Sequence, residues 1–254
     1  MQRARRLASV AVAAALTVGG LSACRSEPDV AIYLGSGAKV TNAEVQRVID
    51  DTRGKLIAQQ DAAKAQQTDA SAPALAPVQM PITGPDVVDA MVSREVATRL
   101  ARSAGVSLPA QLPLAEVGQS LGLPADAEYV KLYAEGRILF AGLLQKASPT
   151  PAADADIRHV FDVFAATGAM KPGLTYEEFR GSVSDQAIQT LGRAVAVKQQ
   201  AQAQIDQLGV RVNPRYGAGK IDVYTEPGPD NKPLALVSVP LTEAGDQSPV
   251  LDAR

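Results

Sequence analysis

The spacing of apolar residues changes twice along the chain, and this change most restricts how the chain can fold. Between residues 41 and 209, apolar side chains recur at the spacing of amphipathic helices. At 30–34, and again between 210 and 240, they alternate with a period of two, as strands do. The sequence therefore predicts a mainly α fold with a small β-sheet built from strand regions near its two ends.

Capping residues divide the helical stretch. Thr41 with Glu44 and Thr175 with Glu178 have the spacing of a capping box. Thr-Pro at 150–151 is typical of a helix start, because Thr can cap and Pro is tolerated at the first position. We expect helices from Thr41 (weakening between Gln60 and Gln67), from Thr83 to Gly105, over Leu114–Leu121, over Asp126–Lys146, from Thr150 to Gly168, and from Thr175 to Gly209, the longest.

The strand at Val30–Leu34 is followed by Gly35-Ser36-Gly37, which indicates a turn, and by Lys39-Val40, which can begin a return strand. An isolated two-stranded hairpin is barely stable in water. We therefore expect the strand at residue 30 to pair with one from the last forty residues, so that the chain ends meet beside the helices.

The amino-acid composition limits which classes of partner the chain can bind and how its core can pack. Alanine dominates the 46% hydrophobic share, Trp is absent and aromatic residues make up 4%, which favours closely packed helices. If residues 1–23 are removed, three arginines leave, so 22 of the 25 basic residues remain against 27 acidic ones and the net charge becomes −5. Such an acidic chain is a poor match for nucleic acid, so no nucleic-acid partner is expected.

The first residues have the layout of a secretory signal. Arg3, Arg5 and Arg6 precede an apolar run from Leu7 to Gly20, which is too short to span a bilayer. The segment Leu21-Ser22-Ala23-Cys24 resembles the lipobox of bacterial lipoproteins. The resemblance implies cleavage before Cys24 and diacylglycerol on its sulfur, which would anchor the chain in the bilayer at the extracytoplasmic face of the cell membrane. The alternative is an ordinary signal peptide with Cys24, the one cysteine in the chain, as an incidental thiol.

These features predict five segments. They are a signal peptide at 1–23, a lipidated tether at 24–29, a helical domain with a small terminal sheet at 30–240, a mobile loop within it at 67–82, and a flexible tail at 241–254.

Candidate reactive groups are few. His159 is the one histidine, so neither a multi-histidine metal site nor a two-histidine centre can form. Asp154 and Asp156 begin like a calcium loop but lack its later ligands, and are expected at a helix N-terminus, where acids are favoured. The segments Gly35–Gly37 and Gly217–Lys220 are incomplete phosphate loops and are expected to be turns. The adjacent Glu177 and Glu178 face different directions on a helix, so they do not form a carboxylate pair. We expect no catalytic residues, metal or cofactor.

Two segments resemble a known family. The run Val-Ala-Ile-Tyr-Leu-Gly-Ser-Gly-Ala-Lys-Val-Thr-Asn-Ala-Glu-Val, residues 30–45, is similar to the start of the SurA N-terminal domain. The run Val-Arg-Val-Asn-Pro-Arg-Tyr-Gly at 210–217 resembles the end of that domain in actinobacterial lipoproteins. The resemblance implies a chaperone-like domain of the SurA and trigger-factor group, which holds extended polypeptide against helices.

Proteins of that group often carry a parvulin-type prolyl isomerase domain. Asp156-Ile-Arg-His159-Val160 is superficially similar to the entry of such a domain, but the second histidine is missing and the spacing around His159 is helical. We therefore expect His159 on a helix surface or half-buried.

The sequence leaves three hypotheses for the function of the chain. The first is a non-enzymatic lipoprotein that binds unfolded or exported polypeptide, and the second is a scaffold lipoprotein that keeps the fold without this activity. The third and least favoured is an isomerase or hydrolase.

Overall fold

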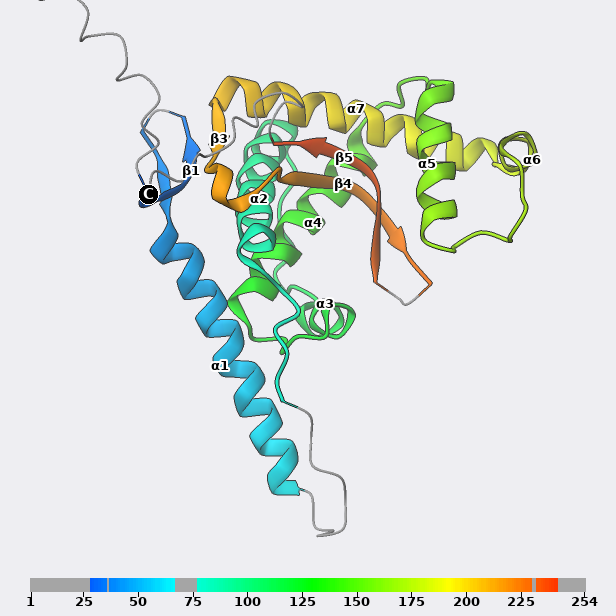
Figure 1. Ribbon diagram of the computed structural model, residues 1–254. Helices are drawn as coiled ribbons and strands as arrows, with labels where there is room; N and C mark the ends of the chain where they lie inside the picture. The colour runs from blue at the N-terminus through cyan, green and yellow to red at the C-terminus, as the bar shows by residue number, and fades with distance from the viewer. Residues whose placement is uncertain (1–27, 36, 67–76, 230–231, 242–254) are drawn as a thin grey trace, which may run out of the picture.

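The computed structural model describes residues 28–35, 37–66, 77–229 and 232–241. Within these ranges the chain forms seven α-helices and five strands, so the mainly α fold with a small terminal sheet is confirmed (Figure 1). Helices occupy the middle of the sequence, and the strands precede and follow them.

The chain ends meet in a three-stranded antiparallel sheet of order β2-β1-β3. Strand β1 (Val30–Leu34) pairs with β2 (Lys39–Thr41) on one side and with β3 (Val210–Val212) on the other, so that Ile32 lies opposite both Val40 and Val212. Pairing across the ends is therefore as expected, but the partner strand lies just before the last forty residues. Strands β4 (Lys220–Pro227) and β5 (Pro233–Pro240), within the last forty residues, form a separate antiparallel pair.

A buried asparagine and a glycine hold this sheet together. The Nδ2 of Asn213 donates to the Val30 carbonyl oxygen at 2.9 Å, which ties the end of β3 to the start of β1. Gly35 has φ +67°, and a Cβ placed on it would lie 2.2 Å from the carbonyl oxygen of Leu208. The turn after β1 therefore requires glycine both for its conformation and for its close approach to the last long helix.

Helix α1 (Asn42–Gln66) begins at the predicted capping box: the Thr41 N–H donates to Glu44 Oε2 at 2.7 Å, and the Glu44 N–H donates to Thr41 Oγ1 at 3.2 Å. Its first half packs through Val45, Val48 and Thr52. The second half is exposed and extends beyond the other helices (Figure 1). The described helix ends at Gln66, within the range Gln60–Gln67 over which it was expected to weaken. Its second half consists largely of Ala, Gln and Lys, which favour helix even without packing.

Helices α2 (Gly84–Ala104) and α4 (Glu128–Lys146) form the centre of the molecule, with the short α3 (Leu114–Leu121) between them in sequence. Gly136 of α4 lies so close to α2 that a Cβ there would be 3.1 Å from Ser93 Oγ. Many core positions on these helices are alanine, valine or glycine, as the composition predicts. Helix α4 begins two residues after the expected Asp126, where Asp51 of α1 accepts the Glu128 N–H at 2.8 Å.

Two further helix boundaries differ from the prediction. Helix α5 (Asp154–Ala166) does not start at Thr150, because the Thr150 N–H donates to the Gly192 carbonyl oxygen at 3.1 Å and so holds this segment against a later helix. The expected long helix from Thr175 is two helices, α6 (Tyr176–Ser182) and α7 (Asp185–Leu208). Val183 is extended between them, and Ser184 Oγ accepts the Ala187 N–H at 3.2 Å to start α7.

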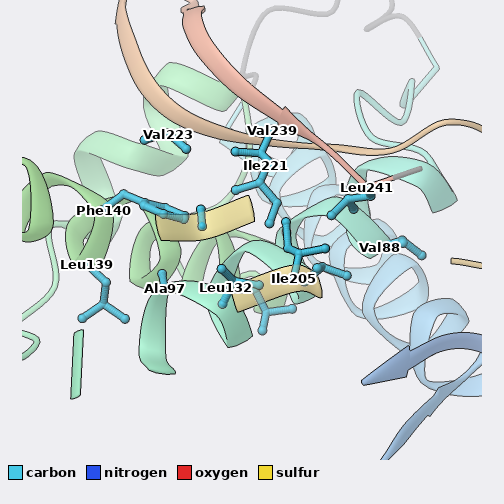
Figure 2. Packing of buried hydrophobic residues seen from close by; sticks show 14 of the residues in the cluster. Val88, Ala97, Leu132, Leu139, Phe140, Ile205, Ile221, Val223, Val239 and Leu241 are labelled. Carbon is cyan, nitrogen blue, oxygen red and sulfur yellow. The ribbon is translucent and has the colours of Figure 1, made fainter. Parts of the chain in front are cut away.

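A two-stranded sheet completes the core. After β3 a 3₁₀ turn, η1 (Pro214–Tyr216), leads into β4 (Lys220–Pro227), which pairs antiparallel with β5 (Pro233–Pro240). Figure 2 shows Ile221 and Val239 directed from this hairpin toward the helices that carry Phe140 and Ile205. Leu241, expected in the flexible tail, is instead buried, and its N–H donates to the Gly219 carbonyl oxygen at 2.9 Å.

Candidate functional site

The predicted lipid anchor, with Leu21, Ser22, Ala23 and Cys24, lies outside the described residues. The first described residues after it are held in place: the Asn42 Nδ2 donates to the Pro28 carbonyl oxygen at 2.6 Å, and the Asn42 N–H donates to the Asp29 carbonyl oxygen at 2.8 Å. The end of the predicted tether is therefore fixed beside the three-stranded sheet. In the parts of the chain that the structure describes, no helix has the length and apolar character needed to cross a membrane.

The predicted mobile loop at 67–82 is described only from residue 77. Residues 77–83 have no helix or strand, and Ile82 is buried, so the loop rejoins the core before α2 begins. The rest of the loop, like residues 242–254 of the tail, lies outside the described residues.

His159 is exposed on α5, within a helix as its spacing predicts. The two acids before it belong to the start of that helix. Asp154 Oδ1 accepts the Tyr176 hydroxyl at 2.7 Å and pairs with Arg180 Nη1 at 2.9 Å, and Asp156 accepts the Ala153 N–H at 2.9 Å. Both acids are therefore held in structural contacts, as expected.

Across residues 28–35, 37–66, 77–229 and 232–241, no three His, Cys, Asp or Glu side chains come close enough together to hold a metal ion. Gly35 and Gly37 lie between β1 and β2, and residues 217–220 lead into β4, so neither glycine segment is at a helix N-terminus. Glu178 belongs to the capping box of α6, and the hydrogen bond from the Thr175 N–H to its carboxylate holds its pKa below the ordinary value.

An apolar groove of about 330 Å³ lies between α3, α4 and the turn end of the β4–β5 hairpin. We call it the apolar groove. Its walls come from α3 and α4, which follow one another in sequence, and from the hairpin much later in the chain. Its size is near the lower end of ligand sites. Its lining residues are Glu116, Val117 and Ser120 of α3, Tyr133, Ala134, Arg137, Ile138 and Ala141 of α4, and Glu226, Pro227 and Pro233 of the hairpin.

Tyr133 and Arg137 form one side of the apolar groove. They lie one turn apart on α4, the guanidinium carbon of Arg137 is 5.8 Å from the ring centroid of Tyr133, and Arg137 Nη1 donates to the Tyr133 hydroxyl at 3.4 Å. The ring of Tyr133 also stacks on Tyr129, with centroids 6.0 Å apart. Tyr129 is buried in the core, so Tyr133 has a fixed orientation at the groove.

On the hairpin, Tyr224 positions Glu226. The Tyr224 hydroxyl donates to Glu226 Oε1. Burial, together with this hydrogen bond, raises the pKa of Tyr224, so the hydroxyl keeps its proton and remains a donor. The carboxylate of Glu226 is therefore held at the rim of the apolar groove, while the pyrrolidine rings of Pro227 and Pro233 add apolar surface beside it.

A second groove, of about 410 Å³, follows the contact between α1 and α4. Most of its charged residues pair with one another: Arg94 Nε lies 2.5 Å from Glu135 Oε2, and Lys55 Nζ lies 3.2 Å from Asp51 Oδ1. Lys55 also donates to the carbonyl oxygen of Asp126. The Arg94–Glu135 pair joins α2 to α4, the Lys55–Asp51 pair lies within α1, and the bond from Lys55 to Asp126 joins α1 to the segment before α4. The charged groove is therefore explained by helix packing.

Asp89 of α2 has the most perturbed carboxyl in the described residues. Its Oδ1 is buried without a hydrogen-bond partner, and its Oδ2 accepts the Lys220 N–H of β4 at 3.3 Å. The pKa of Asp89 is raised from 3.8 to about 7, mainly by burial and to a lesser degree by the nearby Asp222 and Asp86, against the hydrogen bond and charge of Lys220, which lower it. Asp89 joins α2 to the hairpin, far along the strands from the turn end that lines the apolar groove.

The sequence did not identify the apolar groove. The helical spacing of apolar residues in 126–146 indicates only that Tyr133 faces the core, whereas it is half-buried and lines the groove. Pro227 by itself indicates only a turn. What could not be read from the sequence is that this turn lies against α3 and α4, because the docking of the hairpin depends on contacts between distant parts of the chain.

No protein-family model matches the chain, and neither a curated protein nor a solved structure matches it. Its function is therefore inferred from its own residues and their geometry.

Proposed function

We propose that this chain is a lipoprotein anchored through Cys24 at the extracytoplasmic face of the cell membrane, and that it binds unfolded or extended polypeptide without catalysing a reaction. The apolar groove carries the proposal. Its walls are mainly aliphatic, aromatic and proline side chains, with a few polar groups at the rim, which is the usual composition of a site for apolar ligands.

The size of the apolar groove favours a short segment of a client over a folded partner. A volume of about 330 Å³ accommodates a few side chains, whereas a stable interface between folded proteins buries on the order of 800 Å² on each partner. A client segment that inserts a few apolar side chains would bind weakly and reversibly, as a holding chaperone requires.

The hairpin favours recognition by side chains over the addition of a client strand. Pro227 and Pro233 end β4 and begin β5 next to the groove, and proline has no N–H to pair with an added strand. A client at this end of the hairpin would therefore be held by the apolar walls. The resemblance of residues 30–45 and 210–217 to the SurA N-terminal domain supports the same class of ligand.

The test is suppression of aggregation by the purified full-length chain. We expect near-stoichiometric amounts to slow the aggregation of a chemically unfolded client, measured by light scattering. Ala141 is exposed and lines the apolar groove, so Ala141→Trp should fill the groove and remove most of this effect. The matched control is Ala58→Trp, on the exposed half of α1, which should keep it.

Two results would contradict the proposal. If the unmodified chain leaves the aggregation of several clients unchanged, the scaffold function becomes the better account. If Ala141→Trp protects clients as well as Ala58→Trp does, the apolar groove is not the binding site.

A further inference from the structure

We propose that the apolar groove selects extended segments in which a basic residue accompanies apolar ones. This inference rests on the proposed function and adds the class of segment. It starts from the two carboxylates that line the groove, Glu116 on α3 and Glu226 on β4, which come from different elements. A cationic side chain in a bound segment would therefore meet an acidic lining.

The two carboxylates differ in how they are held. Glu226 is oriented by the hydroxyl of Tyr224, which occupies one of its oxygens and leaves the other as an acceptor. Glu116 is exposed, and no ion pair engages it among the described residues. A carboxylate without a cationic partner, beside an apolar surface, is suited to pair with a Lys or Arg from a ligand.

The one cation of the apolar groove is already engaged. The guanidinium of Arg137 lies over the ring of Tyr133 and donates to its hydroxyl, so it packs on α4. The lining therefore carries two acids and one base, and its charge is negative. The whole chain carries 27 acidic and 25 basic residues, so the overall field does not oppose a basic segment.

The expected selectivity is modest, because Glu116 and part of Glu226 are solvent-accessible. Exposed ion pairs contribute about 0.2–1 kcal/mol, which corresponds to a change in affinity of up to about fivefold. The preference should also weaken as salt is added, because salt screens exposed charges.

The test uses three labelled peptides that share the same apolar residues and differ at one position, which is Lys, Gln or Glu. Their dissociation constants with the full-length chain are measured by fluorescence anisotropy at low salt. We expect the Lys peptide to bind about three- to fivefold more tightly than the Gln peptide, and the Glu peptide to bind most weakly. The double variant Glu116→Gln with Glu226→Gln should remove this order. Glu177→Gln, an exposed acid on α6, should leave it intact.

The outcomes separate the two proposals. If the three peptides bind with equal affinity, and Ala141→Trp weakens all of them, the groove binds polypeptide but the charge selectivity is wrong. If the order persists in the double variant, the two glutamates are not its source. If no peptide binds, the proposed function fails together with the selectivity.

Discussion

At the scale of single residues, the contact between α2 and the hairpin depends on the protonation of Asp89. The charged groups that act on it are Asp86 on its own helix, and Asp222 and Lys220 on β4. A Cβ added to Gly219 would lie 2.4 Å from Asp89 Oδ1, so the hairpin backbone covers this oxygen closely. An ionised carboxylate is poorly accommodated in such a site.

This geometry predicts a pH-dependent stability. The pKa of Asp89 is about 7 in the folded chain, above its ordinary value of 3.8, so the folded state holds a proton that the unfolded state releases. The stabilisation from Asp89 should therefore be complete below about pH 4 and be lost as the pH rises to about 7. At pH 8, Asp89→Asn should raise the free energy of unfolding relative to the unmodified chain by on the order of 2 kcal/mol.

The measurement is urea unfolding of the full-length chain and of Asp89→Asn between pH 4 and pH 8, with Asp61→Asn, an exposed position on α1, as the control. A difference between the chain and Asp89→Asn that stays constant with pH would show that Asp89 does not titrate in this range.

At the scale of elements, the break between α6 and α7 depends on a cap. Ser184 Oγ accepts the Ala187 N–H, whereas Ser182, two residues earlier, donates only to the Phe179 carbonyl oxygen of its own helix at 2.7 Å. We expect Ser184→Ala to lower the free energy of unfolding by about 1 kcal/mol, because an N–H of the first turn of α7 loses its partner. Ser182→Ala should change it by less than about 0.5 kcal/mol. Equal effects, measured by thermal or urea unfolding, would contradict the capping role.

Helix ends show where sequence patterns were sufficient to predict the structure. The capping boxes at Thr41 and Thr175 and the helix ends at Gly105 and Gly209 were predictable, because capping depends on residues within one turn. The start of α5 was not, because the backbone of Thr150 is bonded to Gly192, which lies forty-two residues later in the sequence. The apolar groove was likewise not predictable, because Tyr133 and Pro233 are brought to it only by tertiary packing.

At the scale of the whole molecule, the pairing of β1 with β3 places the strands that precede and follow the helices side by side (Figure 1). The described chain begins there, at residues 28 and 29, where Asn42 holds it. The groove is formed by different elements, α3, α4 and the hairpin turn. An anchor at Cys24 would therefore attach at the sheet and not at the proposed binding site.

The anchor itself gives a direct prediction. Cys24→Ala should block lipid attachment, so the chain should remain uncleaved or be released from membranes, as seen by fractionation and by mass spectrometry of the N-terminal residue. Ser26→Ala, two residues further on, is the control and should behave like the unmodified chain. If Cys24→Ala distributes between membrane and soluble fractions as the unmodified chain does, or if Cys24 is found without an acyl group, the lipoprotein assignment is wrong.

The central claim is that the apolar groove binds extended polypeptide, and the absence of tryptophan from the chain allows a direct measurement. Tyr133→Trp places the one tryptophan of the variant in the groove, where it can be excited selectively. Tyr33→Trp, at a half-buried position beside Arg211 in the three-stranded sheet, is its matched control. During titration with an unfolded client that lacks tryptophan, we expect a saturable blue shift of the emission of Tyr133→Trp and no shift for Tyr33→Trp. An unchanged emission from Tyr133→Trp at client concentrations that suppress aggregation would contradict the claim.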